Sequence, residues 1–332
     1  MKLSPQKSLL FLLSLTWPAA VLGLPQVTAG PIRSDLNFGR ADQALERLDN
    51  ALAIDHSDAE AYHLRCRVLY QEQRWDDAIA ACRRAVELAP DNSEYHLWMG
   101  RAWGEKADRV SFLQAYKLAH QVRAEFETAV RLDPKNVDAL SDLGEFDVDA
   151  PAIAGGGLSK AEVIAGQLDP LSASAAHQLR AQIAEQRKDY AQSESELRAA
   201  VAASPAPAHA WADLASFYRR RGRLDDMVAA IRTAASLARH TRSRSESVAL
   251  TDGASLLFRT NREPELAIQM LNEYLSSPAQ SEEAPAFAVR TQLALLLQKQ
   301  GDQEGAEREI AMVHALASGY RDGNLASTNT GR

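Results

Sequence analysis

The sequence predicts an all-α protein, a solenoid in which antiparallel helix pairs stack on one another. Ala, Leu, Glu and Arg dominate the 332 residues and extended β-branched runs are missing, which favours helices over strands. Apolar residues in segment 59–92 recur with the i, i+3, i+4, i+7 spacing of a buried helical face. The pattern returns along the chain at about the same length, and so short a helix pair buries its faces only by stacking on copies of itself.

The N-terminus has the pattern of a secretory signal peptide. Lys2 and Lys7 form a basic region, residues 9–17 (LLFLLSLTW) form an apolar core, and small residues follow Pro18. The core is too short to span a bilayer. We expect residues 1–23 to be cleaved and the chain to be exported to the periplasm or the extracellular space. A leader that stays uncleaved and anchors the chain to a membrane is the alternative.

The next residues predict a linker followed by an incomplete first unit. Pro25, Gly30 and Pro31 oppose a helix, so we expect residues 24–38 to be an irregular linker. Residues 39–58 match only the second helix of a pair, because their small and apolar residues fall 34 residues before those of the next second helix. A terminal unit needs only one buried face.

Residues 59–92 form the clearest helix pair. The polar run at 71–74 (QEQR) makes the turn, and Pro90 ends the second helix because its ring cannot continue one. The segment resembles the tetratricopeptide repeat, a 34-residue unit with a W-x2-L-G-x2-Y, A-x3-F and P pattern. The matching residues are Tyr62, Cys66, Leu69, Ala78, Cys82, Ala85 and Pro90. Arg65 is a departure, since the family usually has Leu there.

Further units in the same phase extend the resemblance over residues 39–317. They lie at residues 93–136, 137–170, 174–207, 208–241, 247–278 and 287–317. The unit at 208–241 is nearly regular and the one at 247–278 is degenerate. The resemblance implies a right-handed superhelix of about seven units.

Three segments depart from the regular pattern. One unit carries extra residues at 107–121, and an apolar stripe continues through them. This predicts a lengthened second helix with Phe112 and Tyr116 partly exposed on its projecting end. Residues 150–158 (APAIAGGGL) are expected to form a flexible loop. Residues 318–332 are expected to form a disordered tail.

The sequence shows no motif for catalysis, for a metal or for a cofactor. It contains no HExxH, CxxC or GxSxG, and the run GGGLSK at 155–160 lacks the spacing and the preceding strand of a phosphate loop. We therefore expect a non-catalytic protein without metal or cofactor; an enzyme with a site near the 150–158 loop is the less favoured alternative. The net charge of −7, which becomes −9 when Lys2 and Lys7 leave with the leader, gives no support for nucleic-acid binding.

The cysteines and histidines carry no sign of special chemistry. Cys66 and Cys82 face inward from opposite helices of one pair, but antiparallel pairing places Cys66 nearer Ala78, about one helical turn off. Two buried thiols are therefore favoured over a disulfide. His63 and His96 occupy near-equivalent positions in adjacent units and are expected to be solvated or to face a partner.

The family resemblance implies that first-helix residues line a concave face, where extended peptides or partner helices bind. By position these residues are His63, Arg67, Tyr70, Leu97, Arg101, Glu105, Ser141, Glu145, Gln178, Gln182, Ser216, Arg219 and Arg220. Arg67 and Arg101 could each bind a partner's carboxylate through two hydrogen bonds. The alternative is that these side chains only keep the groove solvated.

Together these observations predict a non-catalytic scaffold or adaptor for a protein or peptide partner in the cell envelope. An accessory subunit or chaperone of an envelope enzyme complex is the second candidate, and self-association is left open. The sequence does not identify the partner.

Overall fold

The structure is a computed structural model that describes residues 26–241 and 243–321. Over these residues it contains α-helices, one short 3-10 helix and no strand, which confirms the all-α fold class. The predicted leader at residues 1–23 and residues 322–332 of the predicted tail lie outside this part of the chain. No described helix is both long and apolar enough to cross a membrane.

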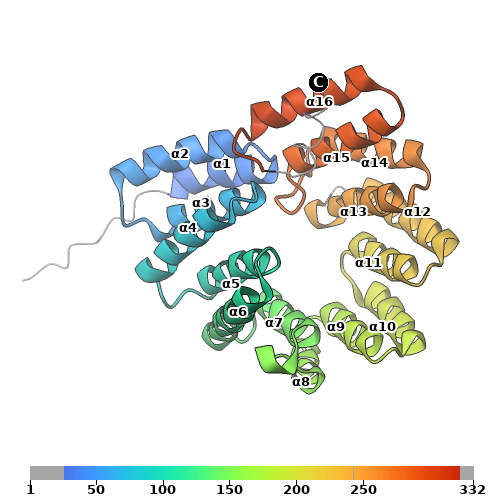
Figure 1. The fold of residues 1–332 in the computed structure, drawn as a ribbon, viewed down its shortest axis with the longest axis horizontal. Helices are drawn as coiled ribbons and strands as arrows, with labels where there is room; N and C mark the ends of the chain where they lie inside the picture. The colour runs from blue at the N-terminus through green and yellow to red at the C-terminus, as the bar shows by residue number, and fades with distance from the viewer. Residues whose placement is uncertain (1–25, 242, 322–332) are drawn as a thin grey trace, which may run out of the picture.

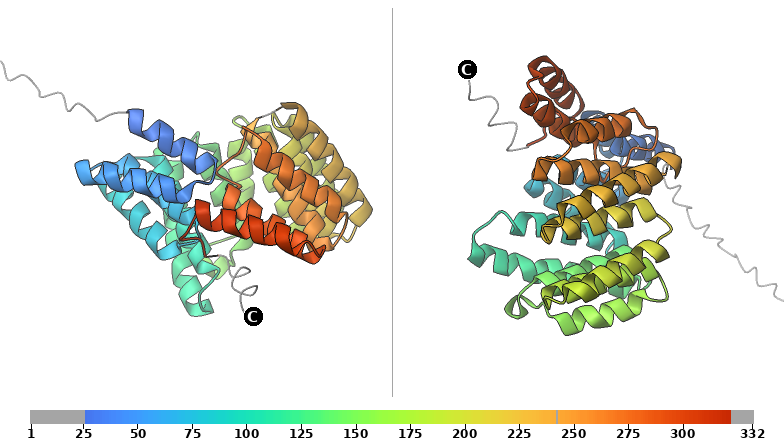
Figure 2. Two further views of the ribbon diagram at one scale, coloured as in Figure 1. Left: turned by 90° about the horizontal axis from the view of Figure 1, so that it is seen from above. Right: turned by 90° about the vertical axis from the view of Figure 1, so that its right-hand side faces the viewer.

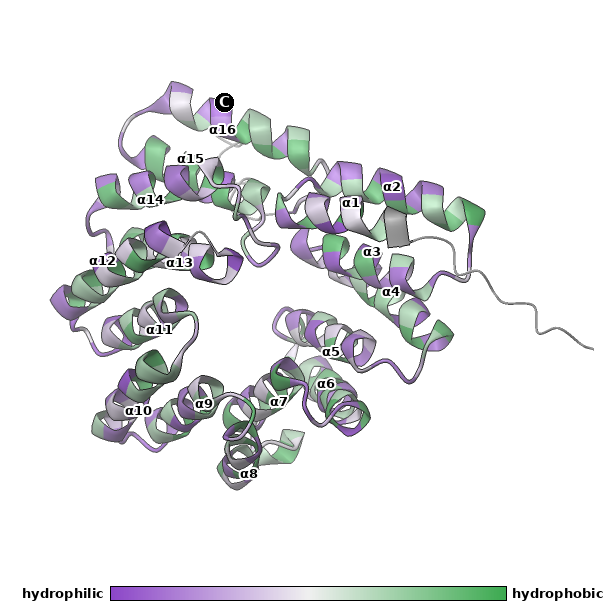
Figure 3. Ribbon diagram, turned by 180° about the vertical axis from the view of Figure 1, so that it is seen from behind, coloured by the Kyte–Doolittle hydropathy of each residue, from purple (hydrophilic) through white to green (hydrophobic). Residues whose placement is uncertain are grey.

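The helices follow one another as antiparallel pairs joined by short turns. In chain order they are α1 (Gln26–Asn37), α2 (Ala41–Ile54), α3 (Ala59–Gln71), α4 (Trp75–Leu88), α5 (Ser93–Ala107), α6 (Phe112–Leu132), α7 (Val137–Asp149), the 3-10 helix η1 (Ala152–Ala154), α8 (Leu158–Leu168), α9 (Ala173–Gln186), α10 (Tyr190–Ala203), α11 (Pro207–Arg220), α12 (Leu224–Thr241), α13 (Arg244–Thr260), α14 (Pro264–Ser276), α15 (Ala286–Lys299) and α16 (Gln303–Leu316). Each helix mixes apolar and polar residues, as expected for elements that bury one face (Figure 3).

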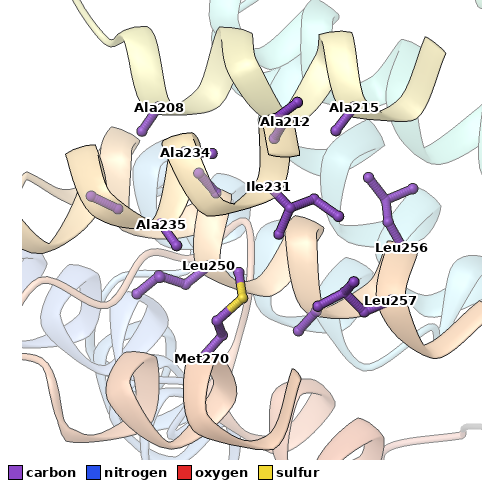
Figure 4. Packing of buried hydrophobic residues seen from close by; sticks show 14 of the residues in the cluster. Ala208, Ala212, Ala215, Ile231, Ala234, Ala235, Leu250, Leu256, Leu257 and Met270 are labelled. Atoms are coloured by element: carbon purple, nitrogen blue, oxygen red, sulfur yellow. The ribbon is translucent and has the colours of Figure 1, made fainter. Parts of the chain in front are cut away.

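Small residues allow close approach both between the helices of a pair and between neighbouring pairs. A side chain at Gly100 would collide with the ring of Phe126, and one at Gly144 would collide with Leu179. In the largest core cluster, buried alanines of α11 pack against Ile231 of α12 (Figure 4). Larger residues interdigitate around these close contacts and fill the interior.

The pairs stack into a superhelix that curves into a ring (Figure 1). The first helix of each pair from α5 to α13 faces the centre of the ring, and the second helix lies outside it. Figure 2 shows the ring from above and from the side.

The two ends of the superhelix contact each other and close the ring. Phe287 of α15 lies in one buried cluster with Ile32 and Leu36 of α1. Arg67 of α3 forms an ion pair with Glu282 in the loop before α15. These residues are more than 200 positions apart in sequence, so the closure is a tertiary feature that repeat periodicity does not encode.

The first residues of the predicted disordered tail take part in this closure. The backbone N–H and the hydroxyl of Ser318 donate to Asp42 of α2, each at 3.1 Å. The backbone N–H of Arg321 donates to the carbonyl of Glu72 at 3.2 Å. The prediction of disorder was therefore wrong for residues 318–321, because the N-terminal unit satisfies their polar groups.

The predicted irregular linker at residues 24–38 is also corrected. Helix α1 covers most of it and contains Pro31, and it supplies the first helix that the 39–58 unit lacked. Proline inside a helix costs about 3 kcal/mol because it removes a hydrogen bond and clashes with the preceding turn. Burial of Ile32 and Leu36, each 2% exposed, offsets that cost, so tertiary packing overrides the local signal.

The extra residues at 107–121 lengthen a second helix as expected, whereas the glycine-rich segment at 150–158 is ordered. Helix α6 has 21 residues against 14 in α4, which confirms the lengthened second helix. The 150–158 segment folds into η1 followed by three glycines, of which Gly155 and Gly157 have φ values of 99° and 156°. The N–H of Gly157 donates to the carbonyl of Asp147 at 2.7 Å, so the expected flexible loop is a compact connection.

Cys66 and Cys82 form a disulfide that joins α3 to α4, so the expectation of two thiols was wrong. Their Cα atoms are 5.1 Å apart, within the normal range for a disulfide. Both residues are at most 1% exposed. At this distance the two positions lie opposite each other, so the offset of one turn that the sequence suggested is absent.

Candidate partner-binding face

Polar side chains link neighbouring first helices around the ring. The hydroxyl of Tyr70 donates to Glu105 at 3.2 Å, joining α3 to α5. The amide of Gln178 donates to Asp213 at 2.7 Å, joining α9 to α11. In both pairs the partners are 35 residues apart, close to one repeat length, because stacking places equivalent positions side by side.

The two arginines proposed to capture a partner's carboxylate already hold carboxylates of this chain. Arg67 donates to both oxygens of Glu282, from Nε at 3.1 Å and from Nη2. Arg101 donates to both oxygens of Asp142, at 2.6 and 3.3 Å. Both guanidinium groups also lie over the ring of Trp98, at 4.9 and 5.1 Å from its centroid. The acceptors of both guanidinium groups are therefore carboxylates of this chain and not of a partner.

Burial and charge oppose each other at Arg101. Burial lowers the pKa of its guanidinium, and the neighbouring Asp142 carboxylate more than compensates, so the net pKa lies above the usual range. Arg101 thus stays charged at every ordinary pH. We assign it a structural role in joining α5 to α7.

Two other predicted site residues are buried under the surface. Leu97 is fully buried in the core between α5 and α7. His63 is 2% exposed and stacks on Tyr95 with ring centroids 4.7 Å apart. Burial lowers the pKa of His63 to about 3, and the nearby Arg67 and Arg33 add to this. His63 is therefore a neutral core residue and offers no contact to a partner.

His96 also departs from the expectation of a solvated histidine. It is 8% exposed, with Nδ1 at 2.6 Å from Glu125 and Nε2 at 2.9 Å from the carbonyl of Pro90. The hydrogen bond to Glu125 raises the pKa of His96 against the opposing effect of burial. It is held inside the α5–α6 pair.

The remaining predicted residues stay at least partly accessible. These are Arg67, Tyr70, Arg101, Glu105, Ser141, Glu145, Gln178, Gln182, Ser216, Arg219 and Arg220. Arg220 forms two hydrogen bonds of 2.9 Å to Glu185 of the preceding first helix. Most of this set is thus engaged in the links between first helices.

A group of carboxylates on the same helices was missed by the sequence analysis. Asp213 of α11 and Asp252 of α13 flank His209, whose ring nitrogens lie 4.0 and 3.7 Å from them. The Asp252 side chain is 43% exposed, so water and ligands reach it. A spacing of about one repeat between acidic first-helix positions was the available signal.

The protein environment raises the pKa of these carboxylates. At Asp252, loss of hydration against the surrounding protein raises the pKa to about 6. The charges of Asp213 and Glu283 raise it further, and His209 lowers it. Burial also raises the pKa of Glu145 on α7, with further contributions from neighbouring carboxylates that include Asp213. Such mutual effects show that the carboxylates share one electrostatic environment.

Neutral amides, and no Lys or Arg, hydrogen-bond to this group. Gln182 donates to Glu145 at 3.1 Å, and Gln178 donates to Asp213. Among the described residues no Lys or Arg forms an ion pair with Glu145, Asp149, Asp213 or Asp252. We call these four residues the carboxylate arc.

The alternative site near the 150–158 segment has little catalytic character. A groove of about 300 Å³ lies beside it, lined mostly by alanines and by apolar residues such as Phe112, Phe146 and Ile153. Its charged lining residues are Asp108 and Asp149. Over the described residues no three His, Cys, Asp or Glu side chains gather as metal ligands.

Comparison with known proteins agrees with the repeat architecture. Residues 36–102 and 179–242 each match a family model described as tetratricopeptide repeat. The crystal structure of yeast Tom70 matches with a TM-score of 0.53 at 16% identity, over 83% of this chain and 55% of that one. At this identity the likeness concerns the fold alone.

Two bacterial structures give lower scores. A thermophilic tetratricopeptide repeat protein of Thermus thermophilus matches with a TM-score of 0.48 and 17% identity, over 57% of this chain and 98% of that one. A tetratricopeptide repeat protein from Parabacteroides merdae matches with a TM-score of 0.46 and 14% identity, over 82% and 100% of the respective chains.

Proposed function

Because the chain belongs to the tetratricopeptide repeat family and is a scaffold for protein–protein interaction, we propose that its carboxylate arc holds a cationic segment of a partner protein. The observation that carries this proposal is the charge imbalance of the inner face. The arginines of α3 and α5 are neutralised by internal carboxylates. Among the described residues no Lys or Arg forms an ion pair with the carboxylate arc; amides and His209 lie beside it, and Arg220 affects Asp213 only through its charge.

The chemistry of such a site favours Lys- or Arg-bearing segments. Each ion pair at an accessible position contributes only about 0.2–1 kcal/mol, so affinity requires several pairs along one segment. Four carboxylates distributed over α7, α11 and α13 provide that number. Their combined field also speeds encounter with a cationic partner, and salt weakens it. No catalytic step is included in this proposal.

We further propose that the scaffold works after export, in the periplasm or cell envelope. Two observations support this placement. The N-terminus has the pattern of a signal peptide. The buried Cys66–Cys82 disulfide belongs to the kind of bond that persists in oxidising compartments. Mass spectrometry of the protein isolated from its own cells tests this: free thiols together with an intact Met1 would contradict export.

A binding titration tests the proposed partner chemistry. The probes are two fluorescent peptides of about 12 residues, one built of Lys, Arg and Gly and the other of Glu and Gly. We expect the chain to bind the cationic peptide and not the acidic one. Replacing Asp213 and Asp252 together by Asn should weaken binding by about tenfold or more, because two charges are lost without loss of shape.

Asp225→Asn is the matched control, since Asp225 is an almost fully exposed carboxylate on the outer helix α12. It removes one charge far from the inner face and should leave affinity nearly unchanged. Equal binding of both peptides would contradict the proposal, as would full-strength binding by the Asp213→Asn, Asp252→Asn variant.

A further inference from the structure

The N-terminal end of α6 is left uncovered by the rest of the chain. None of the residues from 108 to 121 is buried, and Val122 is the first that is. Phe112 is 82% exposed and Leu113 is 70% exposed. Figure 2 shows this end of the α5–α6 hairpin, drawn in teal, reaching beyond its neighbours. The hairpin therefore presents apolar side chains on a projecting end.

A second apolar segment lies across a groove from this end. Ile153 of η1 is 71% exposed, so three of the four most exposed large apolar side chains of the described residues gather here. The groove of about 300 Å³ between them is lined by Phe112, Tyr116 and Ile153, with alanines between. Leu113 is not among the lining residues, so the apolar surface also extends outside the groove.

The charge of this end differs from the charge of the whole protein. Residues 109–124 contain Arg109, Lys117 and Arg123 and no Asp or Glu, although the chain carries a net charge of −7. Arg109 pairs with Glu105, and Arg123 with Glu127. Lys117 is exposed and forms no ion pair with any described residue. The acidic residues that line the groove are Asp108, which caps α5, and Asp149 at the end of α7.

From this combination we infer that the end of the α5–α6 hairpin, together with η1, docks on an anionic lipid surface. An exposed helix end with Phe and Leu on one side and Lys or Arg beside them is the pattern of interfacial binding, in which apolar side chains enter the acyl boundary and cations meet the headgroups. Asp149 of the carboxylate arc also lines this groove, but Asp213 and Asp252 do not, so the variants of those two residues and the variants of this surface test the two proposals separately.

Two other occupants fit the observations less well. A peptide lying in the groove would cover Phe112 and Ile153 but leave Leu113 in water, whereas an acyl layer covers all three. If a second copy of the chain docked through this same surface, its Arg109 and Lys117 would face Arg109 and Lys117 of the first copy, and the like charges would repel. An anionic lipid surface offers an acyl layer to the apolar side chains and headgroups to the cations Arg109 and Lys117.

Vesicle flotation tests the inference. The sample is the chain from Leu24 onward, which keeps every described element and removes the apolar leader as a competing membrane contact. The vesicles contain phosphatidylglycerol and phosphatidylcholine at about 1:2, with pure phosphatidylcholine as the neutral comparison. We expect flotation with the anionic vesicles, weakened by salt, and little with the neutral ones.

Two pairs of variants locate the contact. Phe112→Ser with Leu113→Ser should weaken partitioning by about tenfold or more, because two apolar side chains no longer enter the bilayer. The matched control replaces Ile54 and Val163, which are 78% and 62% exposed on other helices, by Ser and should bind as the parent does.

The charge contribution is tested separately. Lys117→Glu should weaken binding several-fold. Lys135 is an exposed lysine in the turn after α6, and Lys135→Glu should leave binding unchanged. Circular dichroism confirms that each variant folds. If the parent floats with neither vesicle, or if the control variants weaken binding equally, the inference is overturned and a protein segment becomes the remaining occupant of the groove.

Discussion

The inner face of the ring has two regions that differ in charge compensation: in one the charged side chains pair within the chain, and in the other carboxylates have no Lys or Arg partner among the described residues. The arginines of α3 and α5 are neutralised by carboxylates of other elements, Arg67 by Glu282 of the loop before α15 and Arg101 by Asp142 of α7. On α11 and α13, Asp213 and Asp252 share only His209. The first region is therefore completed by the chain itself, and the second leaves charge available to a partner.

The difference teaches that position on the inner face does not by itself assign a residue to binding. Arg67 and Arg101 occupy the positions where a family member would present cations, yet their partners are internal and Arg67 also helps to close the ring. The useful criterion is whether a polar group remains uncompensated after all contacts within the chain have been counted.

The largest expected effect concerns the disulfide that joins α3 to α4. Replacing Cys66 and Cys82 together by Ala should lower the free energy of unfolding by about 2–4 kcal/mol, because the unfolded chain is no longer restricted by the cross-link. Urea unfolding measures this value. An unchanged midpoint and slope would show that the cross-link contributes nothing to stability.

The second effect is a dependence of stability on pH through His63. Burial lowers its pKa to about 3, whereas an unfolded histidine titrates near 6.5. The unfolded state therefore takes up a proton first as the pH falls, so stability present above pH 6.5 is lost progressively towards pH 3. The expected loss between pH 6.5 and 5 is about 2 kcal/mol.

Two variants isolate that effect. His63→Phe keeps a ring against Tyr95 and removes the titrating group, so the difference between pH 6.5 and 5 should shrink. His314→Phe, at an exposed position on α16, serves as the control and should keep the parent's pH dependence. Identical pH profiles for the parent and His63→Phe would rule out His63 as the cause.

The third effect concerns ring closure. Arg67→Met should lower the free energy of unfolding by about 1–2 kcal/mol, because Glu282 is then left partly buried without its partner. Arg65→Met breaks the more exposed pair with Asp49 and should cost less than about 0.5 kcal/mol. Thermal unfolding compares them. Both variants should bind the cationic peptide as the parent does; a loss of binding in Arg67→Met would contradict the division between the two regions.

The smallest expected effect is on binding at the carboxylate arc. The pKa of Asp252 is raised to about 6 by surrounding protein and by Asp213 and Glu283. Its carboxylate is protonated below that pH, so affinity for the cationic peptide should fall several-fold between pH 7.5 and pH 5. Asp252→Asn should bind more weakly at pH 7.5 and show a smaller change with pH. A pH change that persists unaltered in this variant would assign the titration to another group.

The repeat pattern of the sequence predicted the hairpins because helix pairing is a local feature. Spacing of apolar residues, proline after second helices and small residues at crossings located most units, including the lengthened α6. Ring closure was not predicted because its contacts, such as Arg67–Glu282 across 215 residues, join surfaces that no periodicity relates. Helix α1 was not predicted because burial of Ile32 outweighed the local effect of Pro31.

The proposed binding face overlaps the positions expected from the sequence only in part, for a similar reason. The expected positions include Glu145, Gln178 and Gln182 on first helices, but also Leu97 and His63, which lie in the core. A shift of one residue along a helix turns a side chain by about 100°, enough to move it from the surface to the interior. Which charges remain uncompensated depends on partners from other repeats, and these are visible only in three dimensions.

Photo-crosslinking of the cationic peptide is the most direct test of the carboxylate arc. A peptide with a benzophenone group at one end is irradiated with the folded chain, and the attachment sites are mapped by mass spectrometry. We expect attachment to α9, α11 and α13, next to Asp213 and Asp252. Attachment confined to α3 and α5, or to the outer helices, would contradict the assignment of partner binding to the carboxylate arc.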